Sequence, residues 1–208
     1  MQARVKVIRE GGSGEELNVK GGVRGDLHIS DYLPKYATLT SLGRGMIAGC
    51  TTAVATLQVI PTTTSLLTLF NGEAAGGKSY IIERFFASVW ASGSQAPGGV
   101  GIWACIHHSG QTMGTADLTI DTLDGDPYGG MGIADVGATV HNDVWYPWTN
   151  NANFKEGDLD NGGNIGYDVE GRIVIKPTYA ISLHCVSPDA DITVKVGLSW
   201  FEVQIDIA

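Results

Sequence analysis

The strongest constraint on the fold is a series of short apolar runs, separated by turn residues, that fills the chain from position 46 onward. The clearest run has apolar side chains at every second position: Ile192, Val194, Val196, Leu198 and Trp200. This spacing places them on one face of a β-strand, because successive side chains of a strand point to opposite faces. Runs of this kind, with Gly, Asn, Asp and Pro between them, predict an all-β fold.

We predict nine strands in this part of the chain, at residues 46–60, 65–70, 80–91, 100–108, 116–122, 133–140, 172–176, 179–186 and 191–207. In the last run the apolar positions shift by one residue, which predicts a β-bulge at Trp200 and Phe201. Residues 141–171 are rich in Asn, Gly and Asp and are expected to form a long loop. This many strands with almost no helical pattern predict an antiparallel β-sandwich of the jelly-roll kind.

Residues 1–45 differ from the rest and are expected to form an extended N-terminal arm, with the jelly-roll sandwich at residues 46–208. Two short alternating stretches, at 3–7 and 17–19, flank a Gly-rich spacer and hold too few apolar side chains for a core. The arm carries seven Lys and Arg against five acids, a net charge of +2, whereas the rest has six against seventeen, a net charge of −11. We therefore expect the arm to hold a neighbouring subunit or surface, assisted by charge.

Composition excludes several classes of partner. The net charge is −9, and residues 112–170 hold eleven acids and one base, Lys155, so neither nucleic acid nor a membrane is expected as a partner. No run reaches membrane-spanning length, and the N-terminus lacks the apolar centre of a signal peptide. The cysteines Cys50, Cys105 and Cys185 are far apart without metal-binding spacing, which indicates buried thiols in a reducing compartment.

Residues 72–79, GEAAGGKS, match the phosphate-binding pattern GxxxxGK[ST]. That motif needs a helix after it, whose first N–H groups hold the phosphates. Five apolar side chains lie on one face if the following residues are helical: Ile81, Ile82, Phe85, Phe86 and Val89. These residues are also rich in β-branched and aromatic types, and no other segment has a helical period. We therefore interpret 72–79 as a hairpin loop, and nucleotide binding is a distant third hypothesis.

Two acidic loops, at 121–126 and 158–164, are of a kind that can hold calcium, but neither completes a calcium-binding pattern. We interpret both as solvated turns, with a structural ion left open. The Arg-Gly-Asp tripeptide at 24–26 is interpreted as a turn in the arm.

His107 and His108 are neighbours in a predicted strand and point to opposite faces, as do His184 and Cys185. No Cys is predicted beside a His, and no nucleophile with its base is recognised. We therefore expect no catalytic residue, no metal ligand and no cofactor.

Aromatic residues gather at Trp145, Tyr146 and Trp148. Such side chains fill cores and anchor interfaces alike, so both roles stay open. The candidate interaction surface combines this cluster with basic residues of the arm: Trp145, Tyr146, Trp148, Arg4, Lys6 and Arg9.

Three segments resemble small jelly-roll virion proteins of tailed bacteriophages. Residues 171–203, GRIVIKPTYAISLHCVSPDADITVKVGLSWFEV, are similar to their closing strands, and 69–89, LFNGEAAGGKSYIIERFFASV, to one of their hairpins. Residues 25–36, GDLHISDYLPKY, resemble their arm. The resemblance implies a virion location after assembly in the host cytoplasm. The implied partners are further copies of the chain, as a homotrimer, and a major capsid or other virion protein.

The sequence therefore predicts a capsid decoration or cement protein that acts by self-association and is not an enzyme. The alternative is a carbohydrate- or receptor-binding module of a phage tail or fibre, with Trp145, Tyr146 and Trp148 as its platform. Neither hypothesis requires a cofactor.

Overall fold

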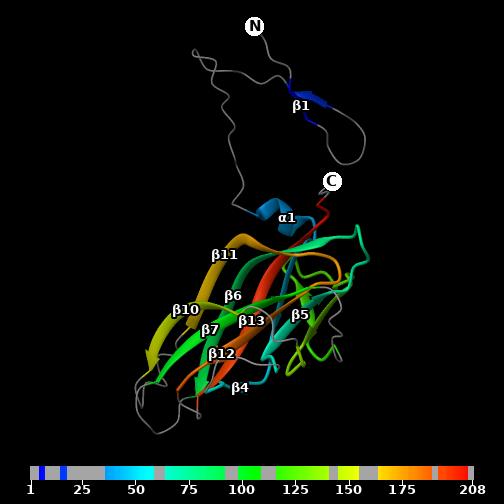
Figure 1. Cartoon of the computed structure of the whole chain (residues 1–208). Coiled ribbons are helices and arrows are strands. Elements are labelled where there is room, and N and C mark those ends of the chain that lie inside the picture. Colours follow the sequence, from blue (N-terminus) through cyan, green and yellow to red (C-terminus); the bar gives the residue numbers. More distant parts are fainter. Residues whose placement is uncertain are drawn as a thin grey trace, which may run out of the picture. The chain divides into compact units, whose positions relative to one another are not determined.

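The computed structural model describes residues 5–7, 15–17, 36–58, 64–91, 98–108, 116–140, 145–154, 164–188 and 192–205 (Figure 1). The chain divides into two compact units, Met1–Thr38 and Leu39–Ala208.

The first unit contains a small hairpin. Strand β1 (Val5–Val7) pairs antiparallel with β2 (Glu15–Leu17), and Val5 lies opposite Leu17. The two alternating stretches of the arm therefore pair with each other. Residues 18–35 lie outside the described residues, so the extended form of the arm stays a prediction. An isolated two-stranded hairpin is marginally stable in water, so this pair gains from an apolar surface to pack on.

A short helix, α1 (Ala37–Ser41), precedes the strands of the body. The body strands are β3 (Gly45–Gly49), β4 (Val54–Ala55), β5 (Leu67–Asn71), β6 (Ser79–Ala91), β7 (Gly98–His107), β8 (Ile120–Thr122), β9 (Gly132–Asp135), β10 (Trp145–Phe154), β11 (Asn164–Ile175), β12 (Ala180–Val186) and β13 (Thr193–Val203). The long strands run the length of the body in Figure 1.

These strands form two antiparallel sheets. The β6 sheet has the order β11-β6-β13-β3-β8, with β4 also paired to β13, and the β7 sheet has the order β10-β7-β12-β5-β9. The chain crosses between the sheets at nearly every connection, and the runs β3-β13-β6-β11 and β5-β12-β7-β10 follow the jelly-roll order. Strands β8 and β9 extend each sheet beyond β3 and β5. The predicted jelly-roll sandwich is confirmed.

The core lies between the sheets and follows from the alternation in the sequence. Every second residue of β13 is buried: Val194, Val196, Leu198, Trp200 and Glu202. On β6, Tyr80 and Ile82 face this core and so do Phe85 and Ala87, all with no exposed surface. The rings of Tyr80 on β6 and Trp200 on β13 both lie in this core, with their centroids 6.1 Å apart and their planes inclined to each other by 32°.

The predicted bulge lies on another strand. Ser199 pairs with Arg84 and Trp200 pairs with Ile82, so Glu83 is an extra residue on β6. The alternation of β13 continues without a slip, and its next inward residue is the carboxylate Glu202 rather than an apolar side chain. The bulge predicted at Trp200 and Phe201 is therefore wrong in its strand, although it lies at the correct level of the sheet.

The predicted loop at 141–171 is also wrong. It contains β10 and the first part of β11, which pair with β7 and β6 respectively. Both lie at sheet edges, where Pro, Gly and Asn are tolerated because one side of the strand has no ladder to maintain. Pairing with a long neighbouring strand therefore outweighs weak local propensity.

Candidate functional site

The candidate site lies on the outer face of the β6 sheet. Because Phe85 and Leu198 point into the core, their neighbours point outward. The register then aligns one outward residue from each of five strands, which we call the Arg84 row: Asp168, Arg84, Ser199, Ile47 and Asp121. A second row beside it, the glycine row, contains Gly166, Phe86, Gly197 and Gly49.

The glycines of this second row let two larger side chains lie flat on the sheet. A Cβ at Gly197 would lie 2.4 Å from Cζ of Phe86, and a Cβ at Gly166 would lie 2.3 Å from Nη2 of Arg84. Glycine inside a strand weakens the strand and often marks a close approach by another group. Here the phenyl ring and the guanidinium take the space that side chains would fill.

Bulges on two strands set the direction of Arg84. The extra residue Glu83 on β6 shifts the alternation so that Arg84 points outward, and 169–172 form a larger irregularity on β11. In that irregularity Glu170 and Gly171 have φ angles of 52° and 74°. Bulges of this kind re-aim side chains and are common beside functional sites.

The guanidinium is further positioned by an ion pair. Nε of Arg84 lies 3.3 Å from Oδ1 of Asp168, and the two side chains are 52% and 69% exposed. Exposed ion pairs contribute little to stability, so this pair orients Arg84 more than it stabilises the fold.

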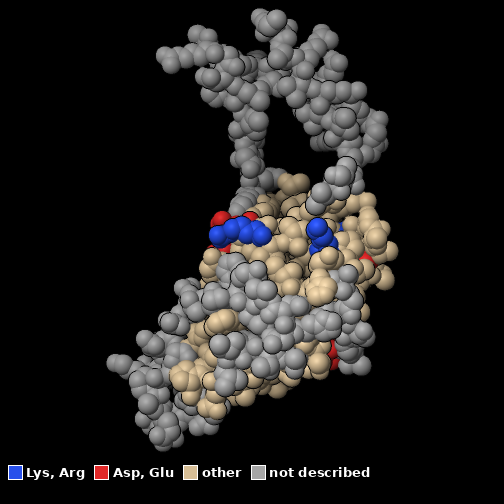
Figure 2. Space-filling model, in the orientation of Figure 1, with Lys and Arg blue, Asp and Glu red and all other residues tan. Residues whose placement is uncertain are grey.

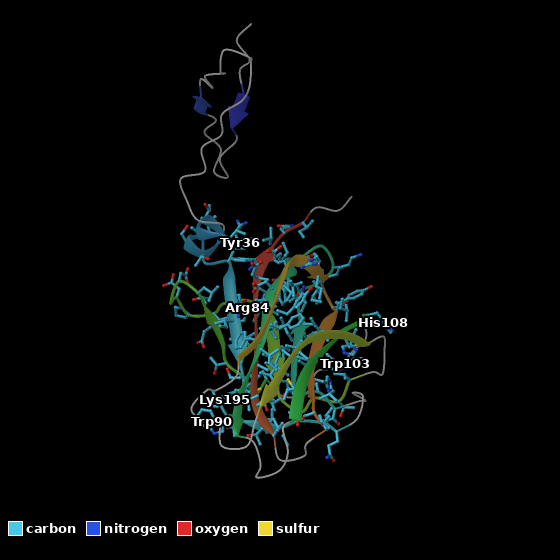
Figure 3. The ribbon with its side chains drawn as sticks, turned by 90° about the vertical axis from the view of Figure 1, so that its left-hand side faces the viewer. Tyr36, Arg84, Trp90, Trp103, His108 and Lys195 are labelled. Atoms are coloured by element: carbon cyan, nitrogen blue, oxygen red, sulfur yellow. The ribbon has the colours of Figure 1, made fainter. Side chains whose placement is uncertain are left out.

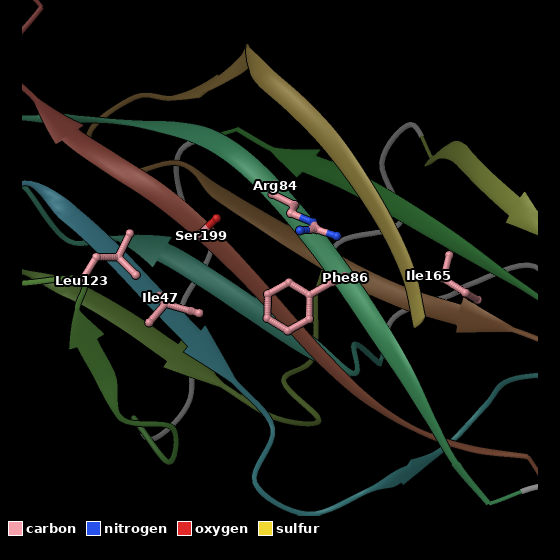
Figure 4. Close-up of a pocket in the computed structure, with 6 residues that line it drawn as sticks. All are labelled: Ile47, Arg84, Phe86, Leu123, Ile165 and Ser199. Atoms are coloured by element: carbon pink, nitrogen blue, oxygen red, sulfur yellow. The ribbon is translucent and has the colours of Figure 1, made fainter. Parts of the chain in front are cut away.

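Together these features form a groove with a volume of about 410 Å³ (Figure 4). Its described lining residues are Ile47, Arg84, Phe86, Leu123, Ile165 and Ser199. They offer apolar contact, one positive charge and one hydroxyl, and none of them carries a carboxylate, imidazole or thiol. Arg84 already contacts Asp168, and Asp121 lies at the other end of the Arg84 row, so the groove suits an apolar segment with one acceptor for the remaining N–H donors of Arg84.

An exposed aromatic residue lies on the same sheet. Trp90 is 62% exposed, and Nζ of Lys195 lies 4.0 Å from the centroid of its ring. Figure 3 shows this pair together at one end of the body, away from Arg84. Exposed Trp residues often anchor interfaces.

Charged side chains are sparse on the face of the molecule in Figure 2, where most of the described surface is uncharged. The described part of that face therefore offers few charges for long-range attraction.

The phosphate-binding match at 72–79 is a loop, as predicted, but it connects β5 to β6 in the other sheet, so the predicted hairpin is wrong. Residues 79–91 form strand β6, so the helix that a phosphate site needs is replaced by a strand. Gly76 has a φ of 84°, and a Cβ at Gly72 would lie 2.2 Å from the carbonyl oxygen of Met131. The loop is also held by Asn71, whose Nδ2 donates to the carbonyls of Lys78 and Ile175 at 2.9 and 3.0 Å. The glycines therefore serve a turn and a close contact.

The lysine of that match is paired with a buried carboxylate. Nζ of Lys78 lies 3.4 Å from Oε2 of Glu202, which is 1% exposed. The hydroxyl of Tyr128 donates to Oε1 of Glu202 at 2.8 Å and accepts from the N–H of Gly132 at 2.7 Å. Burial, and after it the carboxylate of Glu202, raises the pKa of Tyr128 and that of Tyr80, so both phenols stay protonated. This network joins β13 to the connections that precede β6 and β9.

A buried polar cluster on the β7 sheet was missed at the sequence level. Sγ of Cys105 lies 3.8 Å from Nδ1 of His107, and Nε2 of His107 lies 2.7 Å from Oγ of Ser182. The prediction that no Cys lies beside a His is therefore wrong, and the two-residue spacing of Cys105 and His107 was the available signal. All three residues have no exposed surface.

His184 lies on β12, two residues after Ser182, and is also fully buried. Burial, followed by the charge of His107, lowers the pKa of His184 to about 3, so the imidazole is neutral at physiological pH.

The structure describes none of the side chains of the predicted interaction residues. Trp145, Tyr146 and Trp148 begin β10, where their backbones pair with Cys105, Ala104 and Ile102, but their side chains lie outside the described residues. The side chain of Lys6 on β1 is likewise outside them, as are Arg4 and Arg9 entirely. Their role in an interface stays a prediction.

Of the two acidic loops, the structure describes the first, at 121–126. In the first, the N–H of Asp126 donates to Oδ1 of Asp124 at 3.2 Å, and hydrogen bonds, first from Thr122, lower the pKa of Asp124. Asp121 lies on β8 opposite Ile47. Residues 158–163 of the second loop and the tripeptide at 24–26 lie outside the described residues.

Within the described ranges, no group of three or more His, Cys, Asp or Glu is arranged to hold a metal ion. In that same part of the chain, no helix has the length and apolar character needed to cross a membrane. No protein-family model matches the chain. The search of curated proteins found no similar sequence.

Proposed function

We propose that this chain is a virion structural protein, a capsid decoration or cement protein that docks on the particle surface and on copies of itself. The observation that carries the proposal is the groove on the β6 sheet, which is apolar, floored by glycine and fitted with one oriented cation. Its described lining residues offer no acid–base pair, which suits docking rather than catalysis. The jelly-roll order supports the same class, because viral capsid domains use this fold.

Docking would be driven by burial of apolar side chains. Leu123 at the groove is 44% exposed, and burial of this remaining surface contributes about 1 kcal/mol. Phe86 and Arg84 are already held flat by the glycines beneath them, so less side-chain entropy is lost when a partner binds.

The test is to purify particles produced by the genome that encodes this chain, and to locate the chain by mass spectrometry and electron microscopy. The proposal predicts the chain on the capsid surface in a fixed number of copies. An abundant chain that is absent from purified particles would contradict it.

A carbohydrate-binding module is the second candidate, supported by the exposed ring of Trp90 with Lys195 beside it. Lectin domains also use the jelly roll. Host surface polysaccharide, titrated into the protein, separates the two. Saturable binding that Trp90→Ala abolishes would favour this candidate, and lack of binding favours the decoration role.

A further inference from the structure

We infer that residues 26–33 of a second copy of this chain occupy the groove on the β6 sheet. The inference rests on the proposed function, since self-association is part of it, and it names the two surfaces that meet.

The segment has the chemistry that the groove requires. Its sequence is DLHISDYL, with acids at 26 and 31, and residues 25–34 contain no Lys or Arg. Leu27, Ile29, Asp31 and Leu33 fall at every second position, which places them on one face of an extended segment. That face presents three apolar side chains and one carboxylate.

Arg84 can donate hydrogen bonds to this carboxylate. Its Nε is the atom that contacts Asp168, and a guanidinium has five N–H donors in a fixed fork. Asp31 would therefore bind the remaining donors while Leu27 and Ile29 pack against Phe86 and the aliphatic lining.

The length also fits. The Arg84 row crosses five strands, and four spacings of about 4.8 Å give a width of about 19 Å. An extended segment advances about 3.3 Å per residue, so about six residues cross the row. The segment 26–33 has this length with one residue to spare at each end.

Other parts of the arm match less well. Lys and Arg occur at 4, 6, 9, 20, 24 and 35, and would bring like charge to Arg84. The acidic residues Glu15 and Glu16 belong to β2, which is already paired with β1.

The test is a charge exchange in the full chain, read by sedimentation velocity. Arg84→Glu and Asp31→Lys should each weaken self-association at least tenfold, because each places like charges together. The double variant should regain most of the wild-type association. An equimolar mixture of the two single variants should also associate, since the unchanged Asp31 of one chain meets the unchanged Arg84 of the other.

Matched controls are Glu10→Lys in the arm and Lys176→Glu on the body, which change charge equally elsewhere and should leave association within twofold of wild type. Thermal melting of each variant confirms that the body is folded. A monomeric wild type, single variants that associate normally, or no recovery in the double variant or in the mixture would each overturn the inference.

The result is separable from the proposed function. Particle attachment that persists while association ignores the charge exchange would defeat this inference alone. A successful charge exchange in a chain that is absent from particles would defeat the virion role alone.

Discussion

The phenyl ring of Phe86 lies against Gly197 on the neighbouring strand, so closely that a Cβ at residue 197 would come within 2.4 Å of Cζ. The same Cβ would lie 3.0 Å from the carbonyl oxygen of Ala48. Gly197 is therefore required for the flat position of the ring, and the ring forms part of the groove.

Gly197→Ala should displace the ring and destabilise the protein by about 1–2 kcal/mol, because an overpacked site forces its neighbours to shift. Gly49 is the matched control, since it lies opposite Gly197 and a Cβ there would meet its nearest atom at an ordinary 3.6 Å. Gly49→Ala should change the free energy of unfolding by less than about 0.5 kcal/mol. Urea denaturation measures both, and equal effects would contradict the role given to Gly197.

Lys78→Ala should lower the free energy of unfolding by about 1 kcal/mol, because it removes one partner of the buried Glu202, and the half-exposed lysine limits the loss. Lys176→Ala, an exposed change, should cost less than about 0.5 kcal/mol. Calorimetric titration with ATP and magnesium should show no binding. Micromolar binding that Lys78→Ala abolishes would revive the nucleotide hypothesis.

Asp135 should make the protein less stable as pH rises. Burial, followed by its hydrogen bond with Asp117 and the charge of Asp117, raises the pKa of Asp135 from 3.8 to about 6. The folded state therefore holds a proton that the unfolded state releases, and this stabilisation is complete below pH 3.8 and lost as pH rises through 6. Between pH 4 and 7, wild type should lose on the order of 2 kcal/mol relative to Asp135→Asn. Asp126→Asn is the control, and parallel pH profiles of wild type and Asp135→Asn would reject the assignment.

His184 should stay neutral in mild acid. Its lowered pKa means that the unfolded state binds a proton first, so this contribution to stability is present above pH 6.5 and is lost as pH falls toward 3. The imidazole NMR signal of His184, identified by its loss in His184→Gln, should not move between pH 7 and 4.5. A titration midpoint near 6 would show that the side chain reaches water.

The sequence predicted the sandwich because its central strands carry strong local signals, as in the alternation from Val194 to Trp200. It also predicted the strand at 80–91 that forms β6, but it missed the bulge in that strand, where Tyr80 and Ile82 are followed by Phe85 and Ala87 in the opposite phase. This change of phase results from the extra residue Glu83 in the bulge. The apolar side chains around it would also lie on one face of a helix. The local sequence pattern alone does not distinguish a bulged strand from a helix, because a bulge is defined by how the strand pairs with β13.

The groove was not predictable from local patterns. Its rows join β11, β6, β13, β3 and β8, and their alignment depends on register between residues as distant as Ile47 and Ser199. Gly166 and Gly197 are ordinary glycines in the sequence and acquire their role only when Arg84 and Phe86 lie above them. The predicted aromatic surface relied on clustering along the chain, which does not show where a side chain points.

Co-sedimentation of the chain with purified particles tests the central claim most directly, comparing wild type with Phe86→Asp and with Met131→Asp as the control. Met131 is 59% exposed and does not line the groove, so the control places the same charge on another apolar surface. If attachment depends on the groove of the β6 sheet, whether the groove contacts the particle or holds a second copy of the chain, Phe86→Asp should fold and lose at least tenfold in particle binding, while Met131→Asp should bind like wild type. Equal binding by all three proteins, or no binding by wild type, would contradict the account.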